Sequence, residues 1–324
     1  MRRFSNAFGW TLVLAVCSAS AVSATDSAAT RSQQTGAFLA EQLADGIHLM
    51  QPASGRTDLS NSLVVVREDG LLVVDAQASP DAARELLEAI GQISSKPVRY
   101  LVLSHAHAEA AGGASAFPES TLVIGSLGAR DMLRDPQFDF GAEVRARSEN
   151  PRRWEAPEIR SPVLVIHART ELEDPVNEVE LLPLSHAHSQ TDLMVLLPNQ
   201  NILYAGAVLF PDRNPYAADA SVGGWLGVLN HISKIRPAIV IPLSGEPLDV
   251  RSVRVERDSL AWLRGQVELG FIEQVPPEQL TDWVLEAEEL DRHFDRDASP
   301  SFVRILIDRV VEDAVDHRKK RGLM

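Results

Sequence analysis

The sequence predicts an α/β fold in which β-sheets form the middle layers and helices cover them on the outside. Three observations carry this prediction. Short β-branched runs alternate with helical periodicities, the same rhythm recurs in both halves of the chain, and an Asp-Gly pair joins two of the runs as in a hairpin. The chain has 324 residues, 45% of them hydrophobic, which suffices for a substantial core.

The N-terminal residues 1–24 have the pattern of a secretory signal peptide. Arg2 and Arg3 precede an apolar stretch at residues 10–16, and the small residues at 22–24 form a cleavage pattern. This stretch is well short of the roughly 20 residues that span a bilayer, so we expect cleavage rather than stable membrane insertion. The protein is therefore predicted to be periplasmic or secreted.

Charge and cysteine content limit the partners and the sources of stability. Phosphate binding needs clustered cations, and the formal net charge is −14, so nucleic acid is not expected as a partner. Cys17, the one cysteine, lies in the predicted signal peptide, so the mature chain would have no disulfide. Residues 14–17 loosely resemble a lipoprotein signal, which makes a lipid anchor at Cys17 the alternative to free export.

Three parts are expected after the signal peptide. Residues 25–38 are rich in Ser, Thr, Ala and Gln without apolar periodicity, which predicts a flexible leader. Residues 39–250 hold the strand and helix rhythm and predict the main domain. Residues 251–324 have helical periodicity and predict a helical extension. The cations at 317–321 favour a helix C-terminus through its dipole, with a membrane-surface role as the alternative.

The elements follow from local patterns. Residues 63–66 and 71–74 form the predicted hairpin, and a helix over 81–90 is marked by Ser79 as its cap and Pro80 in its first turn. Long loops are expected at 135–160 and near 212–225, where Tyr216 and Trp225 could line a substrate cleft, although aromatic side chains more often serve packing. Further strands are predicted at 98–103, 121–124, 179–184, 193–197, 202–205 and 239–242, and helices at 127–133, around Trp262, at 280–287 and at 302–315.

Two histidine clusters stand directly after predicted strands. His105-Ala106-His107 follows one strand, and His186 and His188 follow another. Alternate positions of an extended loop point to the same side, so each pair can present two imidazoles to a metal. A lone His-x-His pair is a weak signal, because imidazole is also an ordinary loop side chain. The placement of both clusters at strand ends is what favours a metal site.

Residues from about Gly46 to Pro247 resemble the metallo-β-lactamase superfamily, whose hallmark is a His-x-His-x-Asp-His motif followed by a further His, a bridging Asp and a last His. Residues 61–63, 73–75, 188–192 and 197–206 also carry the resemblance. It implies a four-layer αββα sandwich, here with the C-terminal helical extension. Within the superfamily the chain is similar to periplasmic members associated with quinoprotein systems.

By this resemblance His105, His107 and His188 are the ligands of the first metal position. The second position is incomplete, because Glu109 stands where the motif has Asp and three further ligands are replaced by Ala110, Ala207 and Ser244. Alanine cannot bind a metal, and a serine hydroxyl is a poor ligand beside imidazole. One zinc ion is therefore expected rather than two.

The resemblance leaves several roles open. Glu109 could orient a water, act as general base or add a fourth ligand, or it could be a solvated loop carboxylate. Asp75 and Asp192 resemble positions that hold ligand imidazoles in the correct tautomer, but both could equally cap a turn or strand end. His186 is assigned to the pocket wall.

Two functions are consistent with these residues. The first is a hydrolase that uses zinc-bound hydroxide on an ester, amide or lactone-type bond of a small molecule. The second is a non-catalytic family member that binds a small molecule or a protein partner in the periplasm. The loss of the second-position ligands fits the second function directly.

Overall fold

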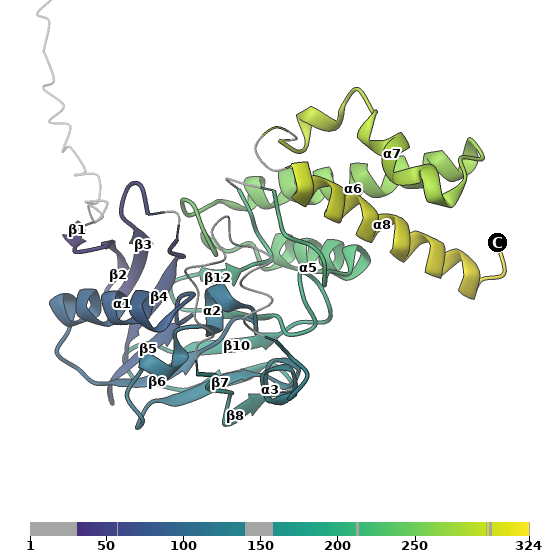
Figure 1. The fold of residues 1–324 in the computed structure, drawn as a ribbon. Coiled ribbons are helices and arrows are strands. Elements are labelled where there is room, and N and C mark those ends of the chain that lie inside the picture. Colours follow the sequence, from purple (N-terminus) through teal and green to yellow (C-terminus); the bar gives the residue numbers. More distant parts are fainter. Residues whose placement is uncertain are drawn as a thin grey trace, which may run out of the picture. The chain divides into compact units, whose positions relative to one another are not determined.

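Two β-sheets face each other in the computed structural model and carry helices on their outer sides (Figure 1). The structure describes residues 31–56, 58–139, 158–211, 214–295, 297 and 300–323, and the chain from Arg31 onward forms one compact unit. The predicted signal peptide, Cys17 and residues 140–157 of the predicted long loop lie outside the described residues.

The first sheet has its strands in sequence order, from an antiparallel half into a parallel half. Neighbours from β1 to β5 pair antiparallel, and those from β5 to β8 pair parallel through helical connections. The side chain of Ser79 caps α1 by accepting from the N–H of Ala82, as predicted. The elements are β1 (Arg31–Thr35), β2 (Phe38–Ala44), β3 (Ile47–Pro52), β4 (Ser62–Val66), β5 (Leu71–Val74), α1 (Pro80–Ile93), β6 (Val98–Val102), α2 (Ala108–Ala111), η1 (Ala114–Ala116), β7 (Leu122–Ser126), α3 (Leu127–Arg134) and β8 (Leu164–Ile166).

The second sheet has the order β13-β12-β11-β10-β9, and only the β12 and β13 pair within it is parallel. Its elements are β9 (Thr170–Leu172), β10 (Val179–Pro183), β11 (Leu193–Leu197), β12 (Ile202–Gly206), α5 (Val222–Ile235) and β13 (Ile239–Pro242). The strands predicted in this half of the chain are all confirmed. The helix α5, which connects β12 to β13, occupies part of the region predicted as a loop.

Alternation along the strands produces the layers. In β4, Leu63 and Val65 face the apolar core between the sheets, whereas Val64 faces the core under α1. In β11, Val195 points between the sheets and Met194 packs toward α5. Each sheet therefore buries both of its faces, and the predicted αββα sandwich is confirmed.

The flexible leader predicted for residues 25–38 is wrong for its second half. Residues 31–35 form β1, which pairs with β2 across a turn at Gly36, where φ is +63°. β1 is an edge strand held by backbone hydrogen bonds, and its polar sequence has no apolar alternation to reveal it. Polar edge strands of this kind are invisible to a search for periodicity.

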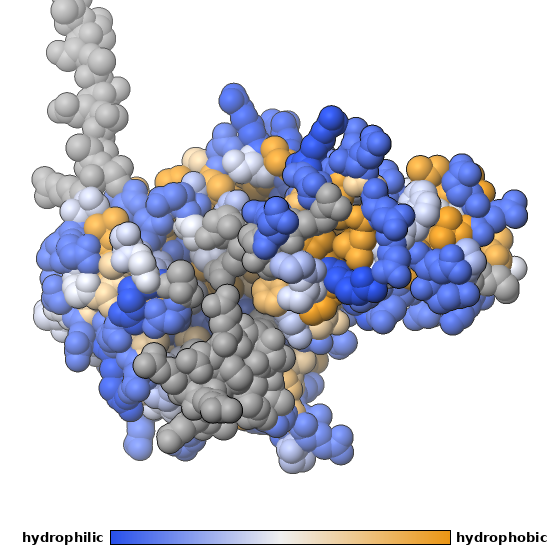
Figure 2. Space-filling view, turned by 45° about the horizontal axis from the view of Figure 1, so that its top comes forward, coloured by the Kyte–Doolittle hydropathy of each residue, from blue (hydrophilic) through white to orange (hydrophobic). Residues whose placement is uncertain are grey.

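The C-terminal helices share one apolar core with α5 and the outer face of the second sheet. They are α6 (Val250–Ile272), α7 (Leu280–Leu285) and α8 (Pro300–Lys320), with 3₁₀ turns η3 (Pro277–Gln279) and η4 (Leu290–Arg292). The predicted apolar stripe of α8 is buried against this core. Within the described residues, none of the helices combines the length and apolar character needed to cross a bilayer. Hydrophilic residues cover most of the coloured surface in Figure 2, with smaller hydrophobic areas between them.

Candidate metal centre

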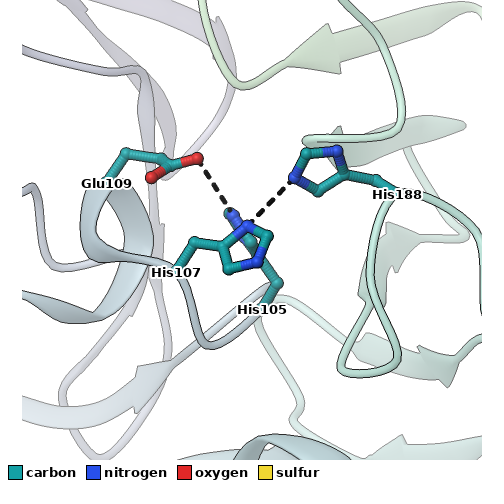
Figure 3. A group of neighbouring side chains, drawn as sticks. All are labelled: His105, His107, Glu109 and His188. Carbon is teal, nitrogen blue, oxygen red and sulfur yellow. Dashed lines mark hydrogen bonds and ion pairs between the residues drawn. The ribbon is translucent and has the colours of Figure 1, made fainter. Parts of the chain in front are cut away.

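Loops at the ends of strands from both sheets bring the histidines to one place. His105 and His107 follow β6, and Glu109 lies in α2 directly after them. His188 lies in the loop between β10 and β11. Figure 3 shows the four side chains pointing toward one another, with His188 approaching from the second half of the chain.

Hydrogen bonds donated by backbone N–H groups join the two histidine loops. The N–H of Leu193 donates to the carbonyl of Ser104 at 2.7 Å, and the N–H of Ala106 donates to Oγ1 of Thr191 at 2.9 Å. Each bond lies within a few residues of a histidine of the site. The relative position of the loops is therefore fixed by the protein itself.

The four side chains form a compact group. The potential ligand atoms of His105, His107, Glu109 and His188 all lie within 4.8 Å of one another. The imidazole ring centroids are 4.9, 5.0 and 5.4 Å apart, and all three rings are buried, whereas the Glu109 side chain is 23% exposed. Across the described residues this is the one group of His, Cys, Asp or Glu side chains arranged so closely.

Two of the spacings between donor atoms match those of ligands around one metal ion. Nδ1 of His107 is 3.1 Å from Nε2 of His188, and Nε2 of His105 is 3.3 Å from Oε1 of Glu109. Two ligands on a tetrahedral zinc at about 2.0–2.1 Å lie about 3.3 Å apart. Three imidazoles and a carboxylate are also a donor set that zinc accepts.

Hydrogen bonds select the nitrogen that His105 presents. Its Nδ1 lies 3.1 Å from Oγ of Ser104, which donates to Asp75 at 2.7 Å. Asp75 also accepts from the N–H of Ser104 and from the hydroxyl of Tyr204. With Nδ1–H directed at Ser104, Nε2 is left for the ion. Asp75 thus acts on His105 through Ser104 rather than by direct contact.

Asp219 provides the corresponding contact for His107 and was missed in the sequence. Its Oδ2 lies 3.0 Å from Nε2 of His107, which leaves Nδ1 of that ring facing His188. The backbone carbonyl of Asp219 accepts a hydrogen bond from Nε2 of His186. Asp219 stands in a loop without motif or periodicity, so no sequence signal marked it.

The other two predicted residues do not touch the ligand group in the hydrogen bonds described. Asp192 accepts from the N–H and Oγ of Ser189 at 3.0 and 2.6 Å, so it holds the turn that follows His188. These hydrogen bonds agree with the alternative that Asp192 caps a turn. His186 is partly buried and lies beside the group, bound to the loop of Asp219.

Carboxylates give the site a field that favours cations. Burial lowers the pKa of His105, but Glu109, Asp75 and Asp192 outweigh burial and raise the pKa above its usual value. Burial raises the pKa of Asp75 and Asp192, against the opposing effect of His105. The same field stabilises a metal ion at this position.

Two aromatic rings pack against the imidazole of His188. Phe210 and Trp225 lie 5.4 and 5.7 Å from the His188 ring, measured between centroids. Trp225 is fully buried in α5, and its indole N–H donates to the carbonyl of Val208 at 2.9 Å. Trp225 thus lies in a helix and not in the predicted loop, and its contact with His188 agrees with the packing alternative for this side chain. The ring of Tyr216 packs against Phe302 of α8.

The structure also describes the three residues that the sequence comparison places at replaced ligand positions. Ala110 and Ala207 are buried and have no side-chain donor atom. Ser244 is 5% exposed and follows β13.

Comparison with known proteins identifies the family. The model of the metallo-beta-lactamase superfamily matches residues 55–244. The chain belongs to the metallo-β-lactamase superfamily. The match spans β4 to the end of β13 and includes all four residues of the metal group.

Relatives within the superfamily are distant. Over 204 residues, 60% of this chain and 70% of the relative, it is 24% identical to a metallo-beta-lactamase type 2 of Bacillus cereus. It is 22% identical to a linear primary-alkylsulfatase of Pseudomonas sp. over 257 residues, 67% of this chain and 48% of the relative. This chain thus spans about half the length of that alkylsulfatase.

Solved structures share the superfamily fold. A stereoselective inverting sec-alkylsulfatase from Pseudomonas sp. matches with a TM-score of 0.67 at 14% identity, covering 84% of this chain and 49% of that chain. A metallo-beta-lactamase from Pontibacter korlensis matches with a TM-score of 0.56 at 17% identity, covering 69% of this chain and 99% of that chain. At these identities the likeness concerns the fold.

Proposed function

We propose that this protein is a metal-dependent hydrolase that binds one zinc ion through His105, His107 and His188 and acts on an ester, amide or lactone-type bond of a small molecule. The observation that carries the proposal is the convergence of three buried imidazoles and Glu109 within 4.8 Å. Superfamily membership supports it, since the relatives include enzymes named as a lactamase and as alkylsulfatases.

The residues around the site have distinct tasks in this proposal. A zinc ion would supply Lewis acidity and lower the pKa of a bound water to about 7. Ser104 and Asp219 hold His105 and His107 in the tautomers that leave Nε2 and Nδ1 for the ion. Glu109 is placed to complete the ligand set or to accept a proton from a reacting water.

We propose one ion because the second position lacks donors. Ala110 and Ala207 offer none, and the hydroxyl of Ser244 is a poor ligand beside imidazole. Hydrolysis would then depend on a single Lewis acid, as in other enzymes whose zinc has three histidine ligands.

Zinc content and turnover of the purified protein test the proposal. We expect about one zinc per chain and hydrolysis of at least one member of a panel of esters, lactones, lactams and alkyl sulfates, with both lost in His188→Ala. The matched control is His231→Ala, an exposed histidine of α5 that should change neither. Absence of bound zinc at micromolar free zinc would contradict the proposal.

A second candidate function is a non-catalytic binding module. It is favoured by the closeness of Glu109 to His105, because a fourth protein ligand closes the position that a catalytic zinc keeps for water. Such a protein would bind zinc tightly and leave every substrate of the panel intact. Turnover that disappears with His188 excludes it.

We also propose that the chain is exported with residues 1–24 removed, and that its ligand is a small molecule rather than nucleic acid. The charge distribution at the N-terminus and the net charge of −14 support this. N-terminal sequencing of the protein from an expressing bacterium should begin at Thr25. A retained N-terminus would contradict export by this route.

A further inference from the structure

The C-terminal helix α8 forms hydrogen bonds with the segment that carries Asp219 and with the start of α5. We name residues 214–221 the bridging segment. Nε of Arg309 donates to the carbonyl of Ala220 at 2.6 Å, and Asp313 accepts from the first backbone N–H of α5 at 3.1 Å. Arg309 and Asp313 also pair with each other at 2.9 Å. Two side chains one turn apart on α8 thus fix the end of the bridging segment.

The start of the bridging segment is fixed to the C-terminal region as well. The side chain of Asn214 donates to the carbonyl of Asp295 at 2.5 Å and accepts from the N–H of that residue at 3.1 Å. The ring of Tyr216 packs edge-on against Phe302 of α8 at 5.5 Å between centroids. Both ends of the bridging segment therefore contact the C-terminal region, at Asp295 and at α8.

The opposite side of the bridging segment faces the histidine loops. The N–H of Ser221 donates to the carbonyl of Ala187 at 2.8 Å, next to His188. Oδ2 of Asp219 lies 3.0 Å from Nε2 of His107. The segment thus connects α8 to both loops that supply the imidazoles.

Asp219 needs this support to hold His107. Its side chain is 50% exposed. On a loop without other contacts, the conformational entropy lost when this carboxylate is ordered would oppose its contact with His107. Because the backbone is already fixed at Ala220, less conformational entropy is lost when Asp219 contacts His107. We propose that Arg309, together with Asp313, is a positioning residue of the metal centre, which acts through Asp219 to hold the His107 ring in its ligand tautomer. This inference rests on the metal site proposed above.

A double-mutant cycle on zinc affinity tests the proposal. Arg309→Met keeps the aliphatic stem and removes the donors, and outer hydrogen-bond partners of ligand histidines are worth about 10–100-fold in metal affinity. In the full chain we expect zinc binding to weaken roughly tenfold in Arg309→Met and in Asp219→Ala. Because both act through one contact, the double variant should be no weaker than Asp219→Ala alone.

Arg304→Met is the matched control, since Arg304 lies on the same helix and pairs with Asp282 at an exposed position. It should leave zinc affinity unchanged. An unchanged affinity in Arg309→Met, or losses that multiply in the double variant, would overturn the proposal, as would equal losses in the control.

A second readout does not need the metal. In the metal-free protein, ¹⁵N NMR of the His107 ring should show a protonated Nε2 in the wild type and a changed tautomer balance in Arg309→Met, with Arg304→Met like the wild type. A ring signal that does not move in Arg309→Met overturns the inference even if the protein binds no zinc. If the proposed metal site is wrong, the wild-type protein will bind no zinc, and this result is distinct from the NMR result.

Discussion

At the scale of single residues, Glu109 determines whether the metal position is closed or open. Its Oε1 lies as close to Nε2 of His105 as two ligands of one ion lie to each other. The carboxylate is therefore close enough to share the first metal position with the three imidazoles. The sequence raised a fourth ligand and a general base as alternatives for Glu109, and it could not choose between them because the choice depends on distances.

Glu109→Gln separates the roles of this side chain. Gln keeps the size and one acceptor oxygen but loses the charge, so we expect zinc affinity to fall by about tenfold or more if the carboxylate is a ligand. Chelator competition measures this, with the exposed Glu119→Gln as control. Unchanged affinity with a large loss of kcat would show that Glu109 is a base and not a ligand.

The ligand histidines could be predicted from the sequence, whereas their supporting residues could not. His105, His107 and His188 stand at strand ends with a recognisable spacing, and strand ends are set by local sequence. Asp219 meets His107 only because distant segments of the chain hold its loop in place. A contact of that kind depends on tertiary structure and leaves no local pattern.

At the scale of elements, α5 approaches the His186–His188 loop without space for a side chain. A Cβ atom at Gly224 would lie 1.8 Å from the backbone carbonyl of His186. Such closeness is what allows Trp225, the next residue, to pack on His188. Gly223 and Gly224 lie in the region predicted as a loop, and glycine is a poor helix former. Gly224 serves close packing instead.

Gly224→Ala should destabilise the protein by about 1–3 kcal/mol, because backbone rather than a flexible side chain must shift. We also expect weaker zinc binding, since the shift moves the His188 loop. Gly227→Ala on the same helix meets nothing within 4 Å and should be neutral or stabilise by up to about 1 kcal/mol. Urea denaturation measures both variants, and equal effects of the two would contradict the packing argument.

The strands of the sandwich show where sequence prediction succeeds and fails. Buried strands such as β5 and β11 have continuous apolar runs and were found. β1 was missed because it is a polar edge strand. A strand that is buried on both faces needs a continuous apolar run, which is visible in the sequence. An edge strand that pairs only through its backbone needs no such run.

At the scale of the whole molecule, the C-terminal helix α6 contacts the metal group through Phe210. Glu256 of α6 accepts from the N–H of Phe210 at 3.1 Å, and the Phe210 ring packs on His188. Burial raises the pKa of Glu256 from 4.5 to about 8, although the hydrogen bond from Phe210 opposes this. The helical extension therefore contributes a titrating group to the region around the site.

A carboxyl whose pKa is raised by folding stabilises the native state fully below its unfolded pKa, and that contribution is lost as the pH rises through the folded value. Glu256 should thus lower stability progressively between about pH 4.5 and pH 8. In Glu256→Gln, which keeps an acceptor for Phe210, we expect a flatter stability profile and a higher Tm than the wild type above pH 8. Parallel profiles of the two proteins across this range would exclude the effect.

X-ray absorption of the zinc-loaded protein tests the single-ion centre most directly. We predict one zinc per chain with nitrogen and oxygen neighbours at about 2.0–2.1 Å and the multiple-scattering signature of three imidazoles. A metal–metal distance of about 3.5–4 Å would contradict the account, as would a spectrum without imidazole ligands.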